Sequence, residues 1–336
     1  MVKKNRVNYL KWIKLSVAAP LSMLLAGVLG LDNVMSAAVI TLLTVQDTKK
    51  DTLEISIKRV IAFGIMTAFC FFLFPLMGHN IFSFAVFVCV FLFICYFAGL
   101  ESGITMNVVL ASHYLEQSQM TLALVGNEAS LLVIGAGMGI LANLIMPENL
   151  RKIRMEQQQI DEAMKRILER MSIYLCKEDR SDYTGECFAE VDRLLKAMEK
   201  EATLRIRNTF SKGDTYFISY MQMRMKQCEV LKSIYKSIMQ LTYIPVQAEA
   251  LSLFLKKVSE SFHERNNVKL LLEDLQEMHN EYRGSELPKS RDEFENRAVL
   301  MQITKELGQL LKIKKDFVDS LTEEEKRKYW TDGGIK

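Results

Sequence analysis

The stretch that decides the fold is VIAFGIMTAFCFFLFPLMGHNIFSFAVFVCVFLFICYFAG, residues 60–99, which contains no Lys, Arg, Asp or Glu. In the wider region between Arg59 and Glu128, Glu101 and Glu116 are the only charged side chains. A helix needs about 20 apolar residues to cross a bilayer, and this region supplies several such segments in sequence. The sequence therefore predicts an integral membrane protein.

Charge divides the chain into two parts. Residues 1–147 hold nine of the 43 Lys and Arg residues and seven of the 40 Asp and Glu residues, and residues 148–336 hold the rest. We therefore predict two domains, a transmembrane domain over 1–147 and a soluble domain over 148–336. The mixed charge of the second domain argues against a nucleic-acid partner, which needs a clustered basic face.

The apolar region breaks into six segments, and the longest polar break runs from Gln46 to Arg59. Helices are expected because an open sheet edge cannot satisfy its backbone groups in lipid. The predicted fold class is all-α, a six-span transmembrane helical domain followed by a cytoplasmic antiparallel helical bundle. The predicted spans are about 12–31, 33–46, 60–78, 81–99, 103–115 and 127–147.

The distribution of basic residues predicts the orientation. Lys and Arg residues precede the first span, separate the second from the third, and follow the sixth. The connections at 32–33, 79–80 and 116–127 have none. Basic residues collect on the cytoplasmic side, so we expect both termini and the soluble domain to be cytoplasmic.

Segments 33–46 and 103–115 are short and comparatively polar. If the six spans are two sets of three, these segments are the middle members of two inverted repeats. Short segments at matching places point to a substrate site at the repeat interface, and Thr41 and Thr44 share one face of the first. The alternative is that these polar side chains only join helices.

Several motifs resemble the aromatic acid exporter family, which is related to fusaric acid resistance proteins. They are TVQDT at 44–48, Arg59 at the head of the next span, Glu128, LLVIGAG at 131–137 and NLIMP at 143–147. The chain is most similar to the small bacterial type, with six spans and a cytoplasmic helical domain. The resemblance implies a multi-pass protein of the bacterial cytoplasmic membrane.

The resemblance also implies a function, export of aromatic or related organic acids by a secondary transport mechanism. The chain departs from the family pattern after Arg59, where Ala62-Phe63 and Met66 replace positions that favour Gly-Thr and Gly, and Thr52 stands where Ser is common. These departures leave the expected fold intact and weaken the inference of a shared substrate.

An organic acid is an anion with an apolar body, so its path needs a cation and neutral hydrogen-bond donors between apolar walls. Arg59 can grip a carboxylate with two parallel hydrogen bonds; the alternative is that it and Lys14 only anchor the helices at the interface. Asp47 would repel an anion and is expected to pair with Arg59 or to cap a helix. His113 could carry a proton. The candidate substrate path is Arg59, Gln46, Thr44, Thr41, Lys14 and His113.

Gly135 and Gly139 lie four residues apart in the last apolar segment. No strand precedes this Gly-rich stretch, so it is not a dinucleotide fingerprint. Residues at this spacing share one helix face and permit close helix contact. We expect the two glycines to serve helix packing, within one chain or between two.

The soluble domain carries four seams of apolar residues at helical spacing. They run over 153–174, 218–241, 251–275 and 303–317, a shorter helix fits 191–204, and Thr322 with Glu325 forms a capping box for a last helix. We expect an antiparallel bundle and a homodimer. Nucleotide-binding, metalloprotease and nucleophile motifs are absent from the sequence, and the six cysteines lack zinc spacing. No enzyme activity, cofactor or metal is therefore expected.

Two other functions stay open at this stage. A passive organic-anion channel would use the same polar path without coupling. A membrane-tethered scaffold would act through its cytoplasmic bundle, and its spans would move nothing. A polar path through the spans favours transport, whereas spans sealed by apolar contacts favour the scaffold.

Overall fold

The computed structural model describes residues 9–117, 119–144, 150–208 and 215–330. These residues form thirteen α-helices and one 3-10 helix, and they contain no strand. The chain divides into two compact units, which we call the N-terminal and the C-terminal unit. The first is Met1–Glu148 with Arg207–Phe210, and the second is Asn149–Ile206 with Ser211–Lys336.

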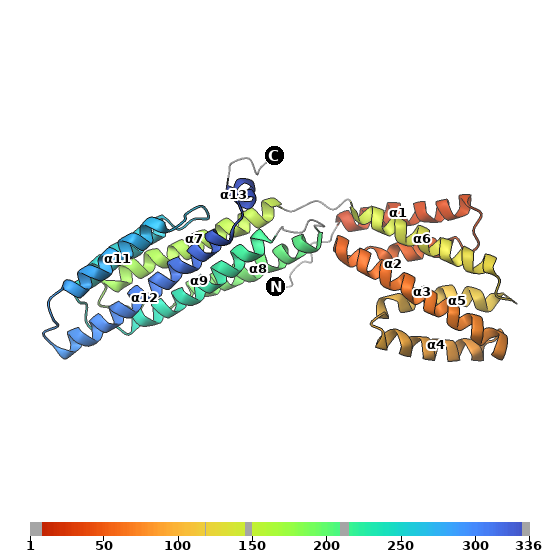
Figure 1. Ribbon diagram of the computed structural model, residues 1–336, viewed down its shortest axis with the longest axis horizontal. Helices are drawn as coiled ribbons and strands as arrows, with labels where there is room; N and C mark the ends of the chain where they lie inside the picture. The colour runs from red at the N-terminus through yellow and green to blue at the C-terminus, as the bar shows by residue number, and fades with distance from the viewer. Residues whose placement is uncertain (1–8, 118, 145–149, 209–214, 331–336) are drawn as a thin grey trace. The chain divides into compact units, whose positions relative to one another are not determined.

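The N-terminal unit has a helix in each of the six predicted apolar segments (Figure 1). In chain order the elements are α1 (Tyr9–Val28), α2 (Met35–Thr44), α3 (Lys49–Met77), α4 (Ile81–Phe97), the 3-10 helix η1 (Glu101–Gly103), α5 (Ile104–Glu116) and α6 (Leu122–Leu144).

Only three of these helices are long and apolar enough to cross a membrane, where the sequence predicted six spans. Among the described residues they are Lys11–Val28 of α1, Lys49–Met77 and Leu122–Leu144. Helix α2 has 10 residues, α4 has 17 and α5 has 13. The predicted spans 33–46 and 81–99 counted the apolar residues of the turns as well, which is why α2 and α4 appeared longer. Residues 145–147 of the last predicted span lie outside the described residues.

The predicted break from Gln46 to Arg59 is wrong, because most of it is helix. Helix α3 begins at Lys49, and the Thr48 side chain accepts a hydrogen bond from the backbone N–H of Asp51 at 3.1 Å. Such a cap satisfies one of the free N–H groups of a first helical turn. The polar residues of this stretch are therefore the first turns of a 29-residue helix.

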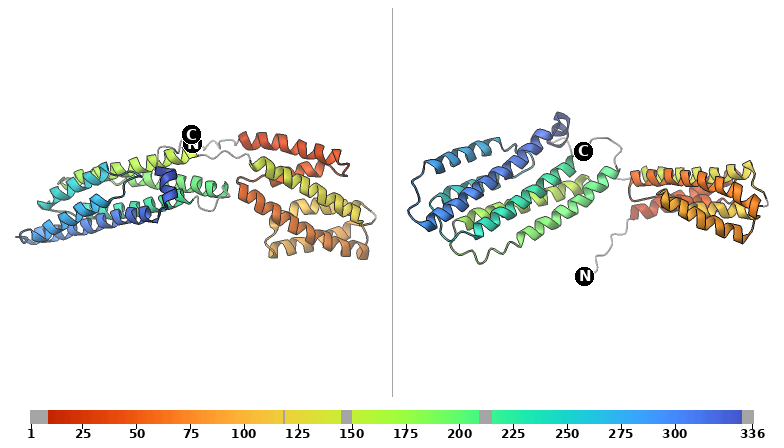
Figure 2. Two further views of the ribbon diagram at one scale, coloured as in Figure 1. Left: turned by 45° about the horizontal axis from the view of Figure 1, so that its top comes forward. Right: turned by 60° about the horizontal axis from the view of Figure 1, so that its bottom comes forward.

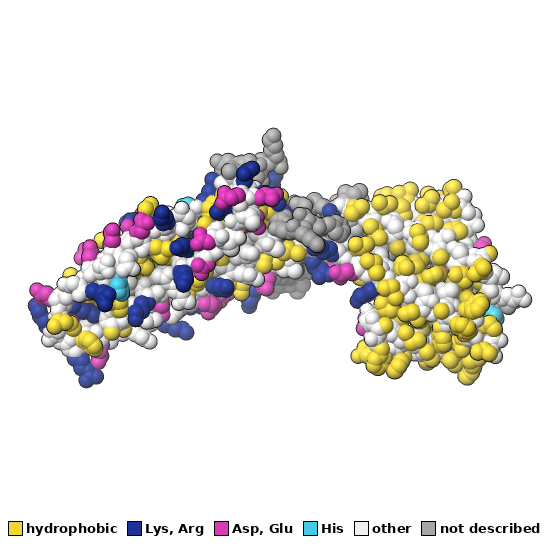
Figure 3. Space-filling model, viewed as in Figure 1, with side chains coloured by type: hydrophobic (Ala, Val, Ile, Leu, Met, Phe, Trp, Pro, Cys, Tyr) yellow, Lys and Arg dark blue, Asp and Glu magenta, His cyan; other side chains and the backbone are white. Residues whose placement is uncertain are grey.

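The surface of the N-terminal unit is apolar, as Figure 3 shows by its dense cover of hydrophobic side chains. Large side chains such as Leu24, Phe72, Phe93 and Val133 are more than half exposed. Contiguous apolar patches of this extent do not face water in soluble monomers. Because three of its helices can also span a bilayer, the chain is a membrane protein.

Helices α2 and α6 pack closely against each other at two glycines of α6. A Cβ atom on Gly135 would lie 2.6 Å from Cβ of Ile40 and 2.7 Å from the carbonyl oxygen of Ala37. A Cβ atom on Gly139 would lie 2.7 Å from Cβ of Thr44. The predicted glycine face thus lies against α2 of the same chain. The backbones of α2 and α6 are too close there to admit a side chain at Gly135 or Gly139.

The C-terminal unit consists of amphipathic helices. They are α7 (Leu150–Leu175), α8 (Cys187–Asn208), α9 (Tyr216–Met239), α10 (Gln247–Glu260), α11 (Lys269–Gly284), α12 (Arg291–Ser320) and α13 (Glu323–Trp330). Figure 1 and both views of Figure 2 show α9 and α12 side by side, and α7 packs on α9 and α10. Figure 3 shows charges of both signs scattered over its surface.

The third apolar seam, 251–275, is two helices rather than one. Helix α10 ends at Glu260 and α11 begins at Lys269. Between them Val268 has φ of 55°, a left-handed conformation that a β-branched residue adopts only under constraint. By contrast, the capping box is confirmed, because Glu325 accepts from the backbone N–H of Thr322 at 3.0 Å and Thr322 accepts from that of Glu325 at 3.2 Å.

The α2–α6 contact predicts unequal effects of alanine at two glycines of the same helix. Gly135→Ala should destabilise the unit by roughly 1–3 kcal/mol, because its methyl group would overpack against Ala37 and Ile40. Gly137→Ala is the control, since no atom lies within 4 Å of its Cβ position, and it should be neutral or stabilising by up to about 1 kcal/mol. Thermal unfolding in detergent micelles measures both, and equal midpoints would contradict the prediction.

Candidate functional site

Arg59 is the most buried cation of the N-terminal unit, with 5% of its surface exposed. Its guanidinium donates from Nη1 to Thr44 Oγ1 at 2.8 Å, from Nη2 to the carbonyl of Leu43 at 3.0 Å, and from Nε to the carbonyl of Ser102 at 3.1 Å. The last carbonyls of a helix have no partner of their own, and α2 ends at Thr44. Arg59 therefore completes the C-terminal end of α2, where the helix dipole also favours a cation.

The Arg59 guanidinium keeps some hydrogen-bonding capacity. A guanidinium carries five N–H donors in a planar fork, and the structure shows three of them bonded to protein oxygen atoms. The remaining donors are on the two terminal nitrogens, which form the edge that a carboxylate grips. Arg59 can thus bind an anion without leaving α2.

Gln46 lies next to Arg59 at the same end of α2. Its side-chain Nε2 donates to the carbonyl of Leu43 at 3.0 Å, and this carbonyl also accepts from Arg59. Its backbone carbonyl accepts from Nδ2 of Asn143 at 3.1 Å, and Asn143 also donates to Thr52 Oγ1 at 2.6 Å. Gln46 and Asn143 therefore join α2, α3 and α6 around the Arg59 site.

Thr41 and Lys14 stand apart from this group. Thr41 Oγ1 contacts the carbonyls of Ala37 at 2.9 Å and Gly135 at 3.0 Å, so its single proton serves the α2–α6 contact. Among the described residues no hydrogen bond or ion pair joins Lys14 to Arg59. Asp47 pairs with Lys11 at 2.7 Å instead of with Arg59. Helix α2 ends three residues before Asp47, and the Asp47 side chain is exposed.

A second ionisable group is buried at the other end of α2. Glu128 on α6 is fully buried, and its Oε2 lies 2.8 Å from Nδ1 of His113 on α5. Its Oε1 accepts from Nδ2 of Asn127 at 3.0 Å. Nε2 of His113 lies 3.5 Å from Oγ of Ser36, near the start of α2. The sequence analysis named His113 and missed Glu128 as its partner, although a carboxylate within an apolar segment is itself the signal of a functional group.

Asn127 connects this buried pair to the surface. It donates to Glu128, and its Oδ1 accepts from the backbone N–H of Asp32 at 2.8 Å. Asp32 and Asn127 line a groove of about 520 Å³ at the α1–α2 and α5–α6 turns. Its other walls are Leu31, Gln117, Gln119, Thr121, Ala123, Leu124, Gly126 and Ser130. Polar contacts therefore run from a water-accessible groove to a buried carboxylate.

The Arg59 and Glu128 sites have the same construction. Arg59 on α3 contacts Thr44, nine residues after the first residue of α2, and Glu128 on α6 contacts His113, nine residues after the first residue of α5. Likewise α1 contacts α2 and α6, and α4 contacts α5 and α3. This is the pattern that two inverted three-helix repeats would produce. Arg59 and Glu128 would then occupy related places in the two repeats.

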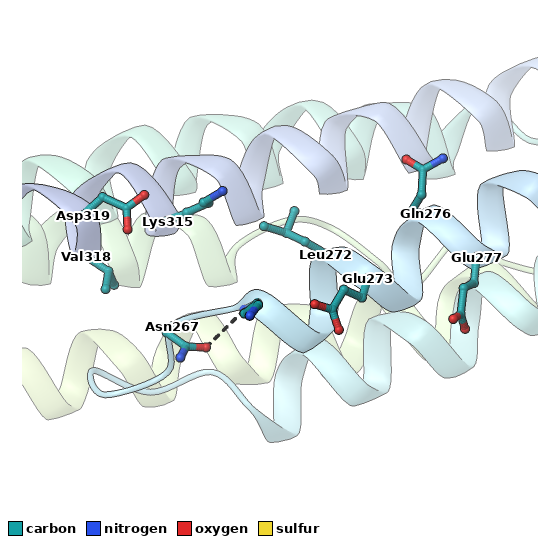
Figure 4. A pocket seen from close by; sticks show the side chains of 9 residues that line it. Asn267, Leu272, Glu273, Gln276, Glu277, Lys315, Val318 and Asp319 are labelled. Carbon is teal, nitrogen blue, oxygen red and sulfur yellow. Dashed lines mark hydrogen bonds between the residues drawn. The ribbon is translucent and has the colours of Figure 1, made fainter.

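The C-terminal unit has a wide groove between α11 and α12, with a volume of about 750 Å³. Figure 4 shows Leu272 and Val318 in it together with side chains of both signs, among them Lys315, Glu273 and Asp319. The mixed charge favours no particular ligand. Among the described residues no group of three or more His, Cys, Asp or Glu could hold a metal ion.

The His113–Glu128 pair predicts a non-additive mutational response. His113→Leu or Glu128→Leu alone should destabilise the protein by about 3–5 kcal/mol, because each leaves the other group buried without its partner. The double variant should cost less than the sum of the two. Exposed Glu116→Leu is the control and should change stability by about 0.5 kcal/mol or less. Unfolding in detergent decides this, and additive effects would contradict the pairing.

Comparisons with known proteins cover nearly the whole chain. Residues 8–146 match "Aromatic acid exporter family member 1", and residues 151–315 match "Putative aromatic acid exporter C-terminal domain". "Uncharacterized protein YqjA" of Bacillus subtilis strain 168 is 27% identical over 312 residues, which are 93% of this chain and 96% of that protein. A crystal structure of a "putative membrane protein from Clostridium difficile 630" is 26% identical, with a TM-score of 0.45, over 50% of this chain and 99% of its own.

The two family matches adjoin at the boundary between the apolar and the charged part of the chain. The relative from Bacillus subtilis shares both parts, since the match covers almost all of each protein. The chain belongs to the aromatic acid exporter family.

Proposed function

We propose that the protein is a secondary transporter that exports aromatic or related organic acids from the bacterial cytoplasm. The observation that carries the proposal is the buried Arg59 at the end of α2, in a chain of the aromatic acid exporter family. All six helices of the N-terminal unit lie in the membrane in this proposal. The C-terminal unit is a cytoplasmic helical bundle.

The short helices support a path through the unit. Helix α2, with 10 residues, is about 15 Å long at 1.5 Å per residue, about half the thickness of the hydrocarbon core. Helix α5, with 13 residues, is about 20 Å long. Helix ends therefore lie within the membrane, where irregular backbone persists only if protein or a water-filled cavity surrounds it. Transporters place their substrate sites at such interrupted helices.

The electrostatics of the Arg59 site suit a carboxylate. Its hydrogen-bond partners among the described residues, Thr44 and the carbonyls of Leu43 and Ser102, are neutral, so no carboxylate of the protein competes for the guanidinium among these contacts. A charge buried with neutral partners attracts an anion more strongly than one already paired. Gln46 adds a neutral amide beside it. An organic acid would bind with its carboxylate at Arg59 and its apolar body toward the surrounding apolar side chains.

A scaffold would not need these features. A membrane anchor is most stable with apolar spans, because buried ionisable groups cost free energy that hydrophobic residues of similar volume do not. The N-terminal unit buries Arg59 at one end of α2 and Glu128 at the other. Their retention favours a transport function over a purely tethering one.

Substitution of Arg59 tests the proposal. Arg59→Gln should lose export of a labelled aromatic acid from loaded vesicles while the protein stays in the membrane. Charge-assisted hydrogen bonds are worth roughly 1.5–3 kcal/mol, so acid affinity should fall about 10- to 100-fold. Arg59→Lys should recover only part, because the planar fork is lost. Lys14→Gln is the control and should change efflux little. Full efflux by inserted Arg59→Gln would remove Arg59 from the path, and no efflux even by the wild type would favour the scaffold.

Cysteine labelling tests the orientation. The basic residues predict that the α5–α6 turn faces outward and the C-terminal unit faces the cytoplasm. In a cysteine-free background, Gln117→Cys should react with an impermeant maleimide in intact cells, and Ser320→Cys should react only after permeabilisation. Both positions are exposed. Labelling of Ser320→Cys from outside would reverse the proposed direction.

A further inference from the structure

The C-terminal unit buries two cations side by side. Arg224 on α9 is 1% exposed and Lys314 on α12 is 2% exposed, and both line one small cavity together with Phe262. We call these three residues the Arg224–Lys314 cluster. Buried Lys and Arg side chains are rare unless each is paired, so the partners of these two decide what the cluster can do.

Arg224 uses only part of its guanidinium. Its Nε lies 2.9 Å from Oδ1 of Asp161, and its Nη1 donates to Oε1 of Gln227 at 2.7 Å. Its buried Nη2 has no hydrogen-bond partner among the described residues. A buried donor without a partner is unfavourable, and more so when it belongs to a charged group, so Nη2 is a place where an acceptor would bind.

Lys314 has no carboxylate bonded to it. Its Nζ donates to the backbone carbonyl of Glu264 at 2.5 Å, the only hydrogen bond of this ammonium among the described residues. The nearby carboxylates already have partners. Asp161 accepts from Arg224 and from the hydroxyl of Tyr220, and Glu264 accepts from Arg154 at 2.6 Å. Asp161 balances Arg224 and Glu264 balances Arg154, so the charge of Lys314 has no carboxylate of its own.

Burial lowers the pKa values of two groups at the cluster, and the neighbouring cations lower them further. Burial, and after it Arg224, lowers the pKa of Lys314 to about 7. Burial, and after it Lys314, lowers the pKa of His263. The charged groups that face Lys314 are Arg154 and Asp161 on α7, Arg224 on α9, and His263, Glu264 and Arg265 in the α10–α11 loop. An anion beside Lys314 would meet a net positive field.

Phe262 occupies the remaining space against the guanidinium. Its ring centroid lies 4.2 Å from Cζ of Arg224, at stacking distance. The other walls are largely apolar and include Val258, Leu271 and Leu310. The cavity left is about 10 Å³, which is room for about one water molecule. Phe262 therefore fills a position that offers a cationic face, an unpaired donor and apolar walls.

The segment that carries Phe262 is a loop under strain. It connects α10 to α11 through residues 261–268 and contains Val268 with its left-handed backbone. Such a conformation is strained for a residue other than glycine and persists only where surrounding contacts enforce it. Displacement of this loop would withdraw Phe262 and Glu264 from the cluster and release that strain.

We propose that the Arg224–Lys314 cluster is a binding site for a small aromatic carboxylate, whose ring replaces Phe262 on Arg224 and whose carboxylate bridges Arg224 Nη2 and Lys314 Nζ. One carboxylate provides two acceptors for these two donors, and the apolar walls receive an aromatic ring. The site lies within the C-terminal unit and does not depend on transport by the N-terminal unit.

Calorimetric titration of the full-length protein in detergent micelles with sodium benzoate tests the site. Saturable binding at pH 6.5 is expected. Lys314→Met keeps the length of the side chain and removes the unpaired charge, so it should fold and bind benzoate roughly 10- to 100-fold more weakly. The control is Lys315→Met, an exposed neighbour on the same helix, which should bind as the wild type does.

Phe262→Ala provides a variant with the opposite effect. Without its ring the site is already open, so benzoate should bind more tightly than to the wild type. A purely structural role of Phe262 would lower stability and leave affinity unchanged or weaker.

The affinity should also depend on pH through Lys314. The carboxylate binds the protonated ammonium, so the affinity should be constant below pH 7 and fall by up to about tenfold per pH unit above it. Lys314→Met should abolish this dependence.

Three results would overturn the proposal. One is the absence of saturable benzoate binding by the wild type, and another is equal affinity of Lys314→Met and Lys315→Met. The third is binding that Arg59→Gln abolishes and Lys314→Met leaves intact, because that would place the benzoate in the N-terminal unit.

Discussion

Helix α2 ends at Thr44 within an apolar unit, where the free carbonyls of its last turn have no water to bond. Arg59 supplies the donors that these groups lack, through the carbonyl of Leu43 and the hydroxyl of Thr44. The short length of α2, the turn into α3 and the contact with α5 all depend on this arrangement. A helix can end inside an apolar unit only if a donor meets its last carbonyls. A charged donor in that role is also the group that the proposed transport requires for an organic anion.

The same chemistry recurs in the C-terminal unit, with different results. Arg180 donates to the carbonyls of Tyr174 and Leu241, near the ends of α7 and α9. Lys314 likewise donates to the carbonyl of Glu264. In each case a buried cation donates hydrogen bonds to backbone oxygen atoms. These oxygen atoms are neutral, so they do not balance the positive charge of the side chain. Each cation thus serves backbone carbonyls, at helix ends for Arg180 and in the α10–α11 loop for Lys314.

Hydropathy was sufficient to predict the apolar segments, because a helix that faces lipid must have apolar side chains of its own. The capping box at Thr322 followed from local hydrogen-bonding rules. The start of α3 was not predictable from hydropathy, since its first turns are polar and only the Thr48 cap marks them as helical. The partners of Arg59 and Glu128 lie on other helices, so sequence spacing could not reveal them. Lys314 was overlooked for a related reason, because a lysine in a charged region is normally exposed.

The two buried charges of the N-terminal unit lie at opposite ends of α2, and the α2–α6 contact separates them. Between them Gly135 lies against Ala37 and Ile40, with its Cβ position already within 2.7 Å of both. Packing this close leaves no room for a solute between the two helices. A carboxylate held at Arg59 can therefore pass to the Glu128 end only if α2 moves relative to α6. Glycine suits that contact, because a surface without side chains lets one helix slide along another. Since α2 bonds Arg59 at one end and approaches His113 at the other, such a movement would change both sites together, which is the coupling that the proposed transport requires.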